Sequence, residues 1–555
     1  MRSSAQHPLS RRDLLAAFLG IPFLAGCDSH SASVPPAGEL VGAGIELGHA
    51  LRDNRFQGAK PDTWQSSEVV IVGAGVAGLS AAWRFSRAGF HDYRLVELES
   101  VPGGTSRSGS SRAGKFPWGA HYLPVPQSDN RALFTLLTEM GVVSGIDDQG
   151  NPQIEEQTLC RDPQERVFFN GAWHEDLWFA EGLTAEDLRQ FALFQAEVDR
   201  WTEWRDGAGR RAFAIPVDRG SDDADMVALD RQTMGDWLSE RGITSSRVRW
   251  LVDYACRDDY GLTVDQTSAW AGLFYFASRV SAPGAHAQPL LTWPEGNGRL
   301  VAHLAAGAQD RIDSGWGVAE IRIAGTTEET STSSPLEILA ANSAGAVRGI
   351  RARQVVFCGP QFLAPHLIEG YRAARGELVR EFHYGSWLVA NLTLRDRPRE
   401  SGFPLCWDNV IYDSPSLGYV VNSHQTGVDR GPTVFTWYYP NCAPEARAAR
   451  ITLEQLGWSD CAELALSDLE RAHPDVRSLV ERIDIMRWGH AMIQPKPRFV
   501  WGPARRACAA PYRGIHFAHS DNSGVALFEE AFYQGIRAAE EVLASRGISF
   551  QTLLK

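Results

Sequence analysis

The residues with the clearest chemical signature form a glycine-rich turn at positions 73–78, which reads Gly-Ala-Gly-Val-Ala-Gly. The turn follows the apolar run 68–72, typical of a strand buried on both faces, and precedes small residues typical of a helix. In that setting the spacing predicts a dinucleotide site. Gly73 permits the tight turn, Gly75 lets the backbone approach a pyrophosphate, and Gly78 lets helix and strand pack closely. The helix N-terminus offers free N–H groups to the phosphates.

An acidic residue stands where such a site requires one. A second strand-like run begins at Tyr93, and Glu97 ends it, 19 residues after Gly78. A carboxylate there accepts hydrogen bonds from an adenosine ribose, and it disfavours the phosphorylated ribose of NADP. Glu99 is a rival for this role, but the end of the strand favours Glu97. The order strand, turn, helix, strand is a βαβ crossover and predicts an α/β fold.

A pair of glycines, Gly103 and Gly104, follows Glu97 after five residues. This spacing resembles the signature of the flavin amine oxidase and phytoene desaturase superfamily, whose glycine pair brings backbone near the FAD diphosphate. Residues 116–122 resemble the Gly-Ala-His-aromatic segment that lies beside the flavin in this family, with Gly119 and Ala120 at its start. The resemblance implies that the dinucleotide is FAD.

Further segments extend the resemblance to the C-terminus. They are a Gly-rich turn before a helix (293–300), a strand (316–321), a strand followed by a small residue and Pro (354–360), and a terminal strand (515–521). In the family, the backbone at the position of Val318 meets the adenine, and an acid at the position of Asp521 holds the ribityl chain. Covalent members attach flavin through a cysteine in a Ser-Gly-Gly-Cys context, which this sequence lacks. The resemblance therefore implies noncovalent FAD.

The same resemblance implies how the chain divides into domains. We expect a Rossmann-like FAD-binding domain built from residues 66–125, 290–360 and 484–548. An α+β substrate domain, from residues 126–289 and 361–483, would be interleaved with it. The substrate cavity should lie at their junction, where ligand sites are common.

The sequence departs from the family in the residues expected to act on the substrate. The strand that often provides a lysine near the flavin, 384–392, has none, and Leu527 stands where an aromatic cage residue is expected. The remaining candidates are Trp488, His490 and His121. His490 could act as a base because an unperturbed imidazole titrates near neutral pH. A histidine hydrogen-bonded within the domain junction is an equally good interpretation of His490.

A charged segment, 257–260, contains Asp258 and Asp259 and is either the rim of a pocket or a solvated loop; the sequence favours the loop. Elsewhere, Thr184 begins a capping-box pattern and is followed by apolar residues at helical spacing (Leu188, Phe191, Phe194, Val198, Trp201), which predicts a helix with a core-facing stripe. Residues 350–357 are expected to form one strand, and residues 528–545 a closing helix with a small-residue face.

The N-terminus carries targeting signals. Arg11 and Arg12 precede an apolar run too short to span a bilayer, and this resembles a twin-arginine export signal. Leu-Ala-Gly-Cys ending at Cys27 resembles the lipobox of bacterial lipoproteins. Residues 1–27 are therefore expected to be a signal peptide that directs Cys27 to lipidation. Residues 28–65, rich in Ser, Ala, Gly and Pro, are expected to be a flexible tether.

The resulting prediction is an FAD-dependent oxidoreductase that the twin-arginine export machinery delivers folded to the periplasmic side of the cell membrane, where its lipid anchors it. The seven other cysteines show neither a disulfide framework nor a metal site, which fits folding in a reducing compartment. The net charge of -13 argues against binding nucleic acid.

Three functions remain open. The leading one is oxidation of a C–N bond in a small-molecule amine or polyamine by hydride transfer to FAD, with oxygen or a redox partner as electron acceptor. The second is a flavin-dependent desaturase or isomerase of an apolar substrate. The third is a noncatalytic, flavin-bearing lipoprotein.

Overall fold

The computed structural model describes residues 36–42, 44–56, 58–127, 129–148, 151–280, 282–284, 287–323 and 335–555. The expected signal peptide and Cys27 lie outside these residues. Within them, no helix is both long enough and apolar enough to cross a membrane.

A five-stranded parallel sheet forms the base of the molecule. Its strand order is β13 (Ile312–Ser314), β4 (Tyr93–Glu97), β3 (Val69–Val72), β17 (Gln354–Phe357), β23 (Ile515–Phe517). All four residues of β3 are buried, as the apolar run predicts. Helices α3 (Val76–Arg87) and α17 (Phe528–Ser545) pack together against the sheet. The α/β fold and the closing helix predicted from the sequence are confirmed.

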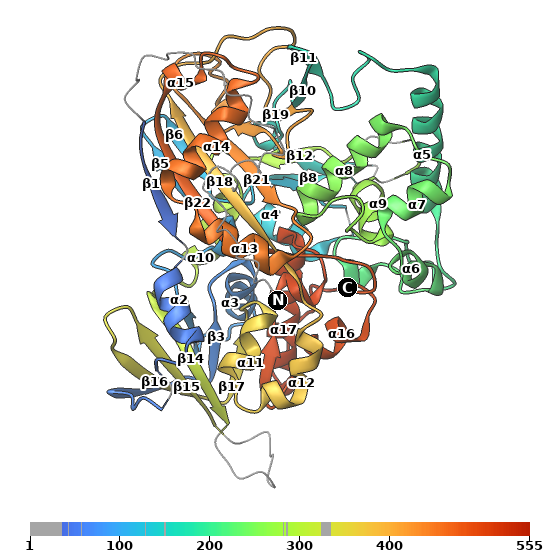
Figure 1. The fold of residues 1–555 in the computed structure, drawn as a ribbon. Coiled ribbons are helices and arrows are strands. Elements are labelled where there is room, and N and C mark those ends of the chain that lie inside the picture. The colour runs from blue at the N-terminus through green and yellow to red at the C-terminus, as the bar shows by residue number, and fades with distance from the viewer. Residues whose placement is uncertain are drawn as a thin grey trace, which may run out of the picture.

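A four-stranded sheet lies beside the parallel sheet, in the lower part of Figure 1. It contains β14 (Trp316–Ile323), β15 (Leu336–Asn342), β16 (Val347–Ala352) and β2 (Thr63–Ser66). The expected single strand 350–357 is wrong, because the chain changes sheet at Arg353. Its N–H donates to the carbonyl of Glu68 (3.1 Å), and the residues on either side belong to β16 and β17.

An eight-stranded mixed sheet occupies the upper part of Figure 1. Its order is β1 (Ala37–Gly42), β22 (Val480–Ile493), β18 (Tyr384–Leu394), β21 (Thr433–Asn441), β20 (Tyr419–Val421), β19 (Asp408–Ile411), β10 (Glu165–Phe169), β11 (Ala172–Glu175). Strand β18 is buried along its whole length. The domain boundary expected at residue 484 falls inside β22, so residues 484–493 belong to this sheet rather than to the FAD-binding part.

Five helices pack on one another beside the eight-stranded sheet. They are α5 (Ala185–Glu203), α6 (Ala224–Leu229), α7 (Met234–Glu240), α8 (Ser246–Tyr260) and α9 (Ala269–Ala277), seen at the right of Figure 1. The capping box at Thr184 is present, with Asp187 as its partner. Phe194 and Trp201 of the predicted stripe are buried, whereas Leu188, near the N-terminus of α5, is 53% exposed.

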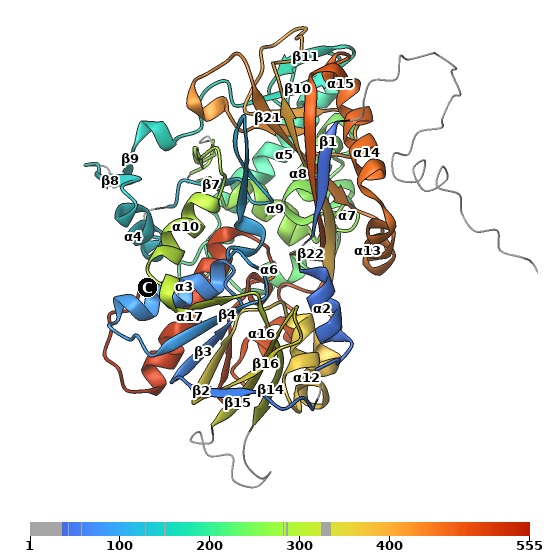
Figure 2. The ribbon, with the colours of Figure 1, turned by 90° about the vertical axis from the view of Figure 1, so that its left-hand side faces the viewer.

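The segment expected to be a flexible tether contains regular structure, namely a strand at residues 37–42, a helix at residues 45–52 and a strand at residues 63–66. Strand β1 pairs in parallel with residues 482–487 of β22, and Figure 2 shows the two side by side. Helix α2 (Ile45–Arg52) follows, and Leu47 and Leu51 pack against Gly317 of β14. The prediction of a tether through residue 65 is therefore wrong, because tertiary pairing overrides a composition typical of linkers. Residues 37–52 are called the N-terminal strap below.

Candidate active site

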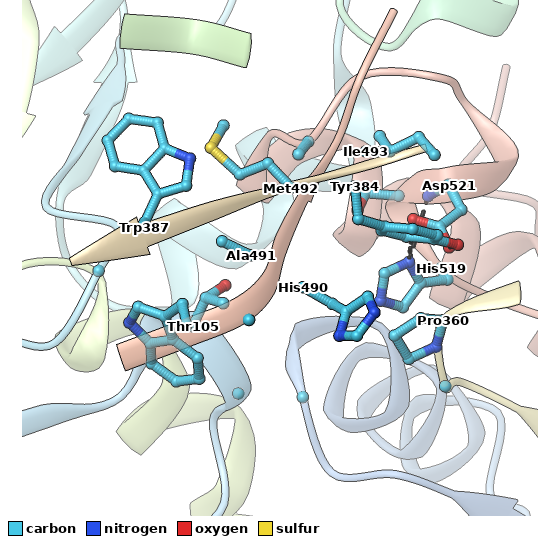
Figure 3. Close-up of a pocket in the computed structure, with 18 of the residues that line it drawn as sticks. Thr105, Pro360, Tyr384, Trp387, His490, Ala491, Met492, Ile493, His519 and Asp521 are labelled. Atoms are coloured by element: carbon cyan, nitrogen blue, oxygen red, sulfur yellow. Dashed lines mark hydrogen bonds and ion pairs between the residues drawn. The ribbon is translucent and has the colours of Figure 1, made fainter. Parts of the chain in front are cut away.

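A cavity of about 1550 Å³ lies between the parallel sheet and the eight-stranded sheet. Its wall includes the glycine-rich turn at one end and residues of β18, β22 and α8 at the other. Figure 3 shows part of this wall, where Tyr384 and Trp387 of β18 lie near His490 and Met492 of β22. The cavity thus lies where the two expected domains meet.

The glycine-rich turn has the shape of a phosphate cradle. Gly73 has a φ of +96°, a conformation that favours glycine. A Cβ on Gly78 would lie 1.9 Å from the Gly73 carbonyl oxygen, so only glycine allows α3 to approach β3 this closely. A Cβ on Gly75 would meet no atom within 4 Å, and Gly75 lines the cavity. The open space at the N-terminus of α3 fits the pyrophosphate of a dinucleotide.

The two glutamates beside this turn hold different partners. Glu97 ends β4 and is 8% exposed; its carboxylate accepts hydrogen bonds from the N–H groups of Ala74 (2.5 Å) and Glu99 (2.8 Å). Burial raises the pKa of Glu97 despite these bonds. The Glu99 carboxylate accepts from the Gly44 N–H of the strap (2.5 Å) and from Arg107 (3.2 Å). Both glutamates line the cavity, so both lie within reach of a ribose there.

The glycine pair lies directly against the turn. The Gly103 N–H donates to the carbonyl of Ala74 (2.8 Å), and a Cβ on Gly104 would lie 3.4 Å from the Cα of Gly75. Gly103 also has a φ of +126°. The structure therefore brings together the two glycine elements that the sequence assigned to the diphosphate.

The segment expected beside the flavin runs along the same wall. The Ala120 N–H donates to the Thr105 carbonyl (3.1 Å), and a Cβ on Gly119 would lie 2.4 Å from that oxygen. The Tyr438 hydroxyl of β21 donates to the Gly119 carbonyl (2.9 Å). Gly119 and Ala120 therefore connect the phosphate end of the cavity with the eight-stranded sheet.

The last two predicted FAD contacts also line the cavity. Val318 is buried on β14, near the strap. Asp521 is fully buried; its carboxylate accepts from the Tyr384 hydroxyl (2.6 Å) and the Gln361 N–H (2.9 Å), and it lies 2.9 Å from His519 (Figure 3). Burial alone would raise the pKa of Asp521, but the adjacent His519 and these hydrogen bonds lower it. Asp521 is thus held as a carboxylate facing the cavity.

His490 lies in the cavity wall on β22. Its ring stacks on Phe362, with the ring centroids 4.2 Å apart. Desolvation by the cavity wall, followed by the charge of the nearby Arg450, lowers the pKa of His490 to about 3. The imidazole is therefore neutral at physiological pH, and a neutral ring of such low basicity is a weak general base.

Trp488 and His121 are held by contacts within the protein. The indole N–H of Trp488 donates to the carbonyl of Trp118 (2.7 Å), and the Arg107 guanidinium lies 5.4 Å from its ring centroid. His121 stacks on Tyr438 at 4.8 Å, and burial lowers its pKa to about 4. Both line the cavity, where they can shape it and exclude water.

Sequence reasoning missed a group of acids at the other end of the cavity. Asp258 and Asp259 belong to the last turn of α8 and line the cavity, so the favoured interpretation as a solvated loop is wrong. Asp259 is 4% exposed and forms a two-fold salt bridge with Arg279 (3.0 and 2.8 Å). The signal in the sequence was the helical spacing of Tyr254 and Asp258, which places both on one face of α8.

Among the described residues, no group of three or more His, Cys, Asp or Glu side chains could hold a metal ion. The cavity therefore combines a dinucleotide cradle, a stretch of aromatic and histidine side chains, and an acidic end. Such a site can hold FAD along the cradle with an organic cation beyond it.

Comparisons with known proteins place this cavity in context. The family described as flavin containing amine oxidoreductase matches residues 76–543. No curated protein sequence matches the chain. Among solved structures, a putrescine oxidase variant redesigned in cofactor binding has 15% sequence identity and a TM-score of 0.63, covering 87% of this chain and 100% of that one. Cyclohexylamine oxidase from Brevibacterium oxydans has 16% identity and a TM-score of 0.61, covering 87% of this chain and 99% of that one.

Proposed function

We propose that this protein oxidises the C–N bond of an amine. The premise is that the chain belongs to the family of flavin-containing amine oxidoreductases and is an FAD-dependent enzyme. The observation that carries this proposal is the Asp258 carboxylate in the wall of the cavity that contains the dinucleotide cradle. A buried acid is costly beside an apolar substrate but favourable beside an ammonium group. The acidic wall therefore favours an amine over the apolar substrate of a desaturase or isomerase.

The chemistry divides between the cofactor and the chain. Bound FAD would accept a hydride from the carbon next to the nitrogen, which leaves an iminium ion that water hydrolyses to a carbonyl compound and ammonium or a smaller protonated amine. The glycine-rich turn and Asp521 hold the cofactor. His121, Tyr438 and Trp387 enclose the space beyond it and exclude water. Oxygen or a redox partner takes the two electrons.

The cofactor is proposed to be noncovalent. Cys358 is the cysteine that lines the cavity among the described residues. A Cβ on Gly73 would lie 3.5 Å from the Cys358 carbonyl oxygen, so this cysteine sits at the phosphate end rather than at the ring end. Burial also raises the pKa of its thiol far above neutral pH, which leaves little reactive thiolate.

The test is anaerobic titration of the purified, flavin-loaded protein with a panel of primary and secondary amines, followed by absorbance. Reduction of the flavin by an amine, with formation of an aldehyde or ketone, is the expected result. A protein that binds FAD but is reduced by no amine would refute amine oxidation. A product with a new C=C bond and no release of ammonia would identify the desaturase instead.

We also propose that the protein is exported folded and anchored on the periplasmic side of the membrane. The support is in the sequence, in Arg11, Arg12 and Cys27. Metabolic labelling with a fatty acid should label the wild-type protein and not Cys27→Ser. Equal labelling of both would refute lipidation at Cys27.

A further inference from the structure

Three carboxylates meet near the far end of the cavity. Glu165 of β10 and Asp408 of β19 are register partners on adjacent parallel strands, so their side chains lie next to each other on one face of the sheet. The Tyr254 hydroxyl of α8 lies 3.4 Å from the Asp408 carboxylate. Asp258, four residues after Tyr254, lies on the same face of α8. Glu165, Asp258 and Asp408 are called the carboxylate trio below.

Asp258 has no protein partner of its own. The part of its side chain that remains exposed faces the cavity. Among the described residues, it has no hydrogen bond and no ion pair. The two nearest arginines are engaged elsewhere: Arg279 bonds to Asp259, and Arg257 bonds to Asp253 (3.0 Å) and to the carbonyl of Pro415 (3.0 Å).

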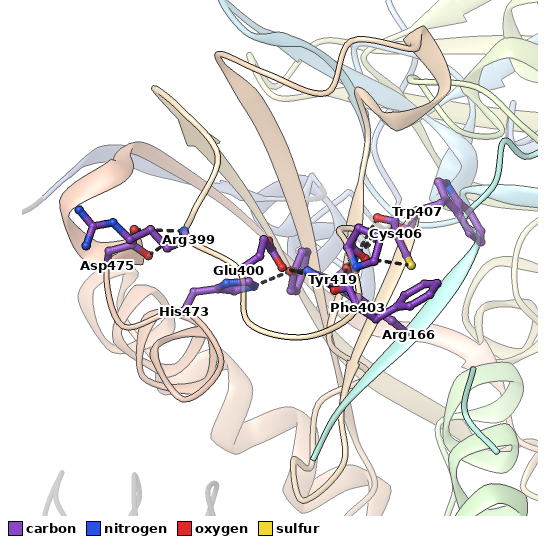
Figure 4. Close-up of polar contacts among 11 residues, drawn as sticks. Arg166, Arg399, Glu400, Phe403, Cys406, Trp407, Tyr419, His473 and Asp475 are labelled. Atoms are coloured by element: carbon purple, nitrogen blue, oxygen red, sulfur yellow. Dashed lines mark hydrogen bonds and ion pairs between the residues drawn. The ribbon is translucent and has the colours of Figure 1, made fainter. Parts of the chain in front are cut away.

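The arginine that neighbours Glu165 in sequence is also occupied. Successive strand residues point to opposite faces, so Arg166 faces away from the trio. Figure 4 shows its guanidinium among Glu400, Phe403 and Tyr419. It donates to the Phe403 carbonyl (2.9 Å) and the Tyr419 hydroxyl (3.1 Å), and it forms a salt bridge with Glu400. No cation within the described residues thus pairs with the trio.

The surroundings of the trio therefore disfavour the ionised form of its three carboxyl groups. Burial, and then the neighbouring Asp259 and Asp408, raise the pKa of Asp258 well above its usual range. Burial, followed by the field of Asp408, does the same to Glu165, and burial raises the pKa of Asp408 to about 7. The charges of Arg279 and Arg257 offset this rise for Asp258 only in part. A positive charge bound beside Asp258 would favour ionisation of the trio. In the described part of the chain, no group of three or more His, Cys, Asp or Glu side chains could hold a metal ion, and an organic cation would supply a positive charge here.

Aromatic rings surround the same space. Tyr254, Tyr275 and Tyr438 lie close enough to Asp258 that its charge raises the pKa of each hydroxyl, after the larger effect of burial. Trp407 packs against His121 with ring centroids 5.5 Å apart. Aromatic faces beside carboxylates attract ammonium groups in preference to compact, strongly hydrated ions.

We propose that the carboxylate trio, with Asp258 in contact with the ligand, is a subsite for a second ammonium group, so that the substrate is a diamine or longer polyamine rather than a monoamine. This inference rests on the proposed amine oxidation. Asp258 lines the same cavity as the cofactor cradle and the segment from Gly119 to Tyr122, so one amine of the substrate would be bound at the trio while the other is oxidised.

The experiment compares Asp258→Asn with wild type and with Asp413→Asn. Asn matches Asp in size, and the exposed Asp413 of the same domain provides an identical substitution outside the cavity. The readout is kcat/KM for diaminobutane and diaminohexane against butylamine and hexylamine. Wild type and Asp413→Asn should prefer the diamines. In Asp258→Asn, kcat/KM for the diamines should fall by about tenfold to a hundredfold relative to kcat/KM for the monoamines, since a hydrogen bond to the second ammonium group is lost.

A second measurement separates binding from folding. Asp258 loses no protein partner on substitution, so the thermal midpoint of Asp258→Asn should equal or exceed that of wild type, and its flavin absorbance should be unchanged. If wild type shows no preference for diamines, or if Asp258→Asn keeps that preference, the subsite is refuted while amine oxidation stands. If no amine reduces the wild-type flavin, the proposed function itself fails.

Discussion

The glycine-rich turn allows a matched pair of substitutions, Gly75→Ala and Gly78→Ala, to separate cofactor binding from folding. The new methyl group at position 75 would meet no protein atom within 4 Å and would enter the cavity. At position 78 it would lie 1.9 Å from the Gly73 carbonyl oxygen, a backbone atom that cannot rotate away. We therefore expect opposite effects from the same added atom.

The magnitudes follow from these surroundings. Gly75 precedes α3 with φ of -71° and ψ of -174°, which alanine adopts without strain, so the apo protein should lose about 1 kcal/mol or less, from the weaker capping preference of alanine. A displaced phosphate should lose a charge-assisted hydrogen bond, about 1.5–3 kcal/mol, which raises the Kd for FAD by about tenfold to 150-fold. Gly78→Ala should destabilise the apo protein by about 3 kcal/mol or more, because the helix must move off the strand.

The assay needs apo protein of each variant. FAD titration followed by flavin fluorescence gives the Kd, and thermal unfolding of the apo proteins at one scan rate gives their relative stability. The reasoning would be refuted if Gly75→Ala bound FAD as tightly as wild type, or if it lowered the apo midpoint as much as Gly78→Ala did.

Three further predictions test buried charges. His490→Gln should leave the pH dependence of kcat/KM unchanged between about pH 6 and 9, because an imidazole with a pKa near 3 is already neutral there. If the variant instead loses the acidic limb of the curve of kcat/KM against pH, His490 is the base. Burial raises the pKa of Glu530 to about 8, so the unfolded state loses this proton at a lower pH than the folded state, and the stability of the wild type should fall as the pH rises from about 4.5 to 8. Glu530→Gln should remove this fall. Parallel curves of the thermal midpoint against pH for wild type and Glu530→Gln would contradict the prediction. Arg279→Met should destabilise the protein by about 3–5 kcal/mol in denaturant unfolding, because it leaves Asp259 buried and unpaired. Adding Asp259→Asn to this variant should recover much of the lost stability. If the effects of the two substitutions are additive, Arg279 and Asp259 are not coupled.

Local signals in the sequence were enough to predict the βαβ unit of the cofactor-binding part. The apolar run before Gly73, the glycine spacing and the acid at Glu97 all fall within one βαβ unit, where each residue contacts others nearby in sequence. The closing helix 528–545 was equally clear, because its small residues recur at helical spacing and Gly535 packs on Ala77.

Features that depend on distant partners were not predictable in the same way. The polar and small residues of β1 become a strand only because β22, more than 400 positions later, offers its edge. The change of sheet at Arg353 likewise depends on Glu68. Asp258 looked solvated because nothing near it in sequence indicates that β10 and β19 close the space above α8.

Strand β1 also determines how the large sheet ends. It is a six-residue edge strand, and without it the edge would be the 14-residue β22, in which Ile483, Ile485 and Met486 are buried. Long, exposed apolar edges recruit strands from other molecules and aggregate, whereas short edges resist this. A chain that lacks residues 37–42 would uncover this edge. We therefore expect these residues to protect solubility, and a chain trimmed past them to aggregate more readily.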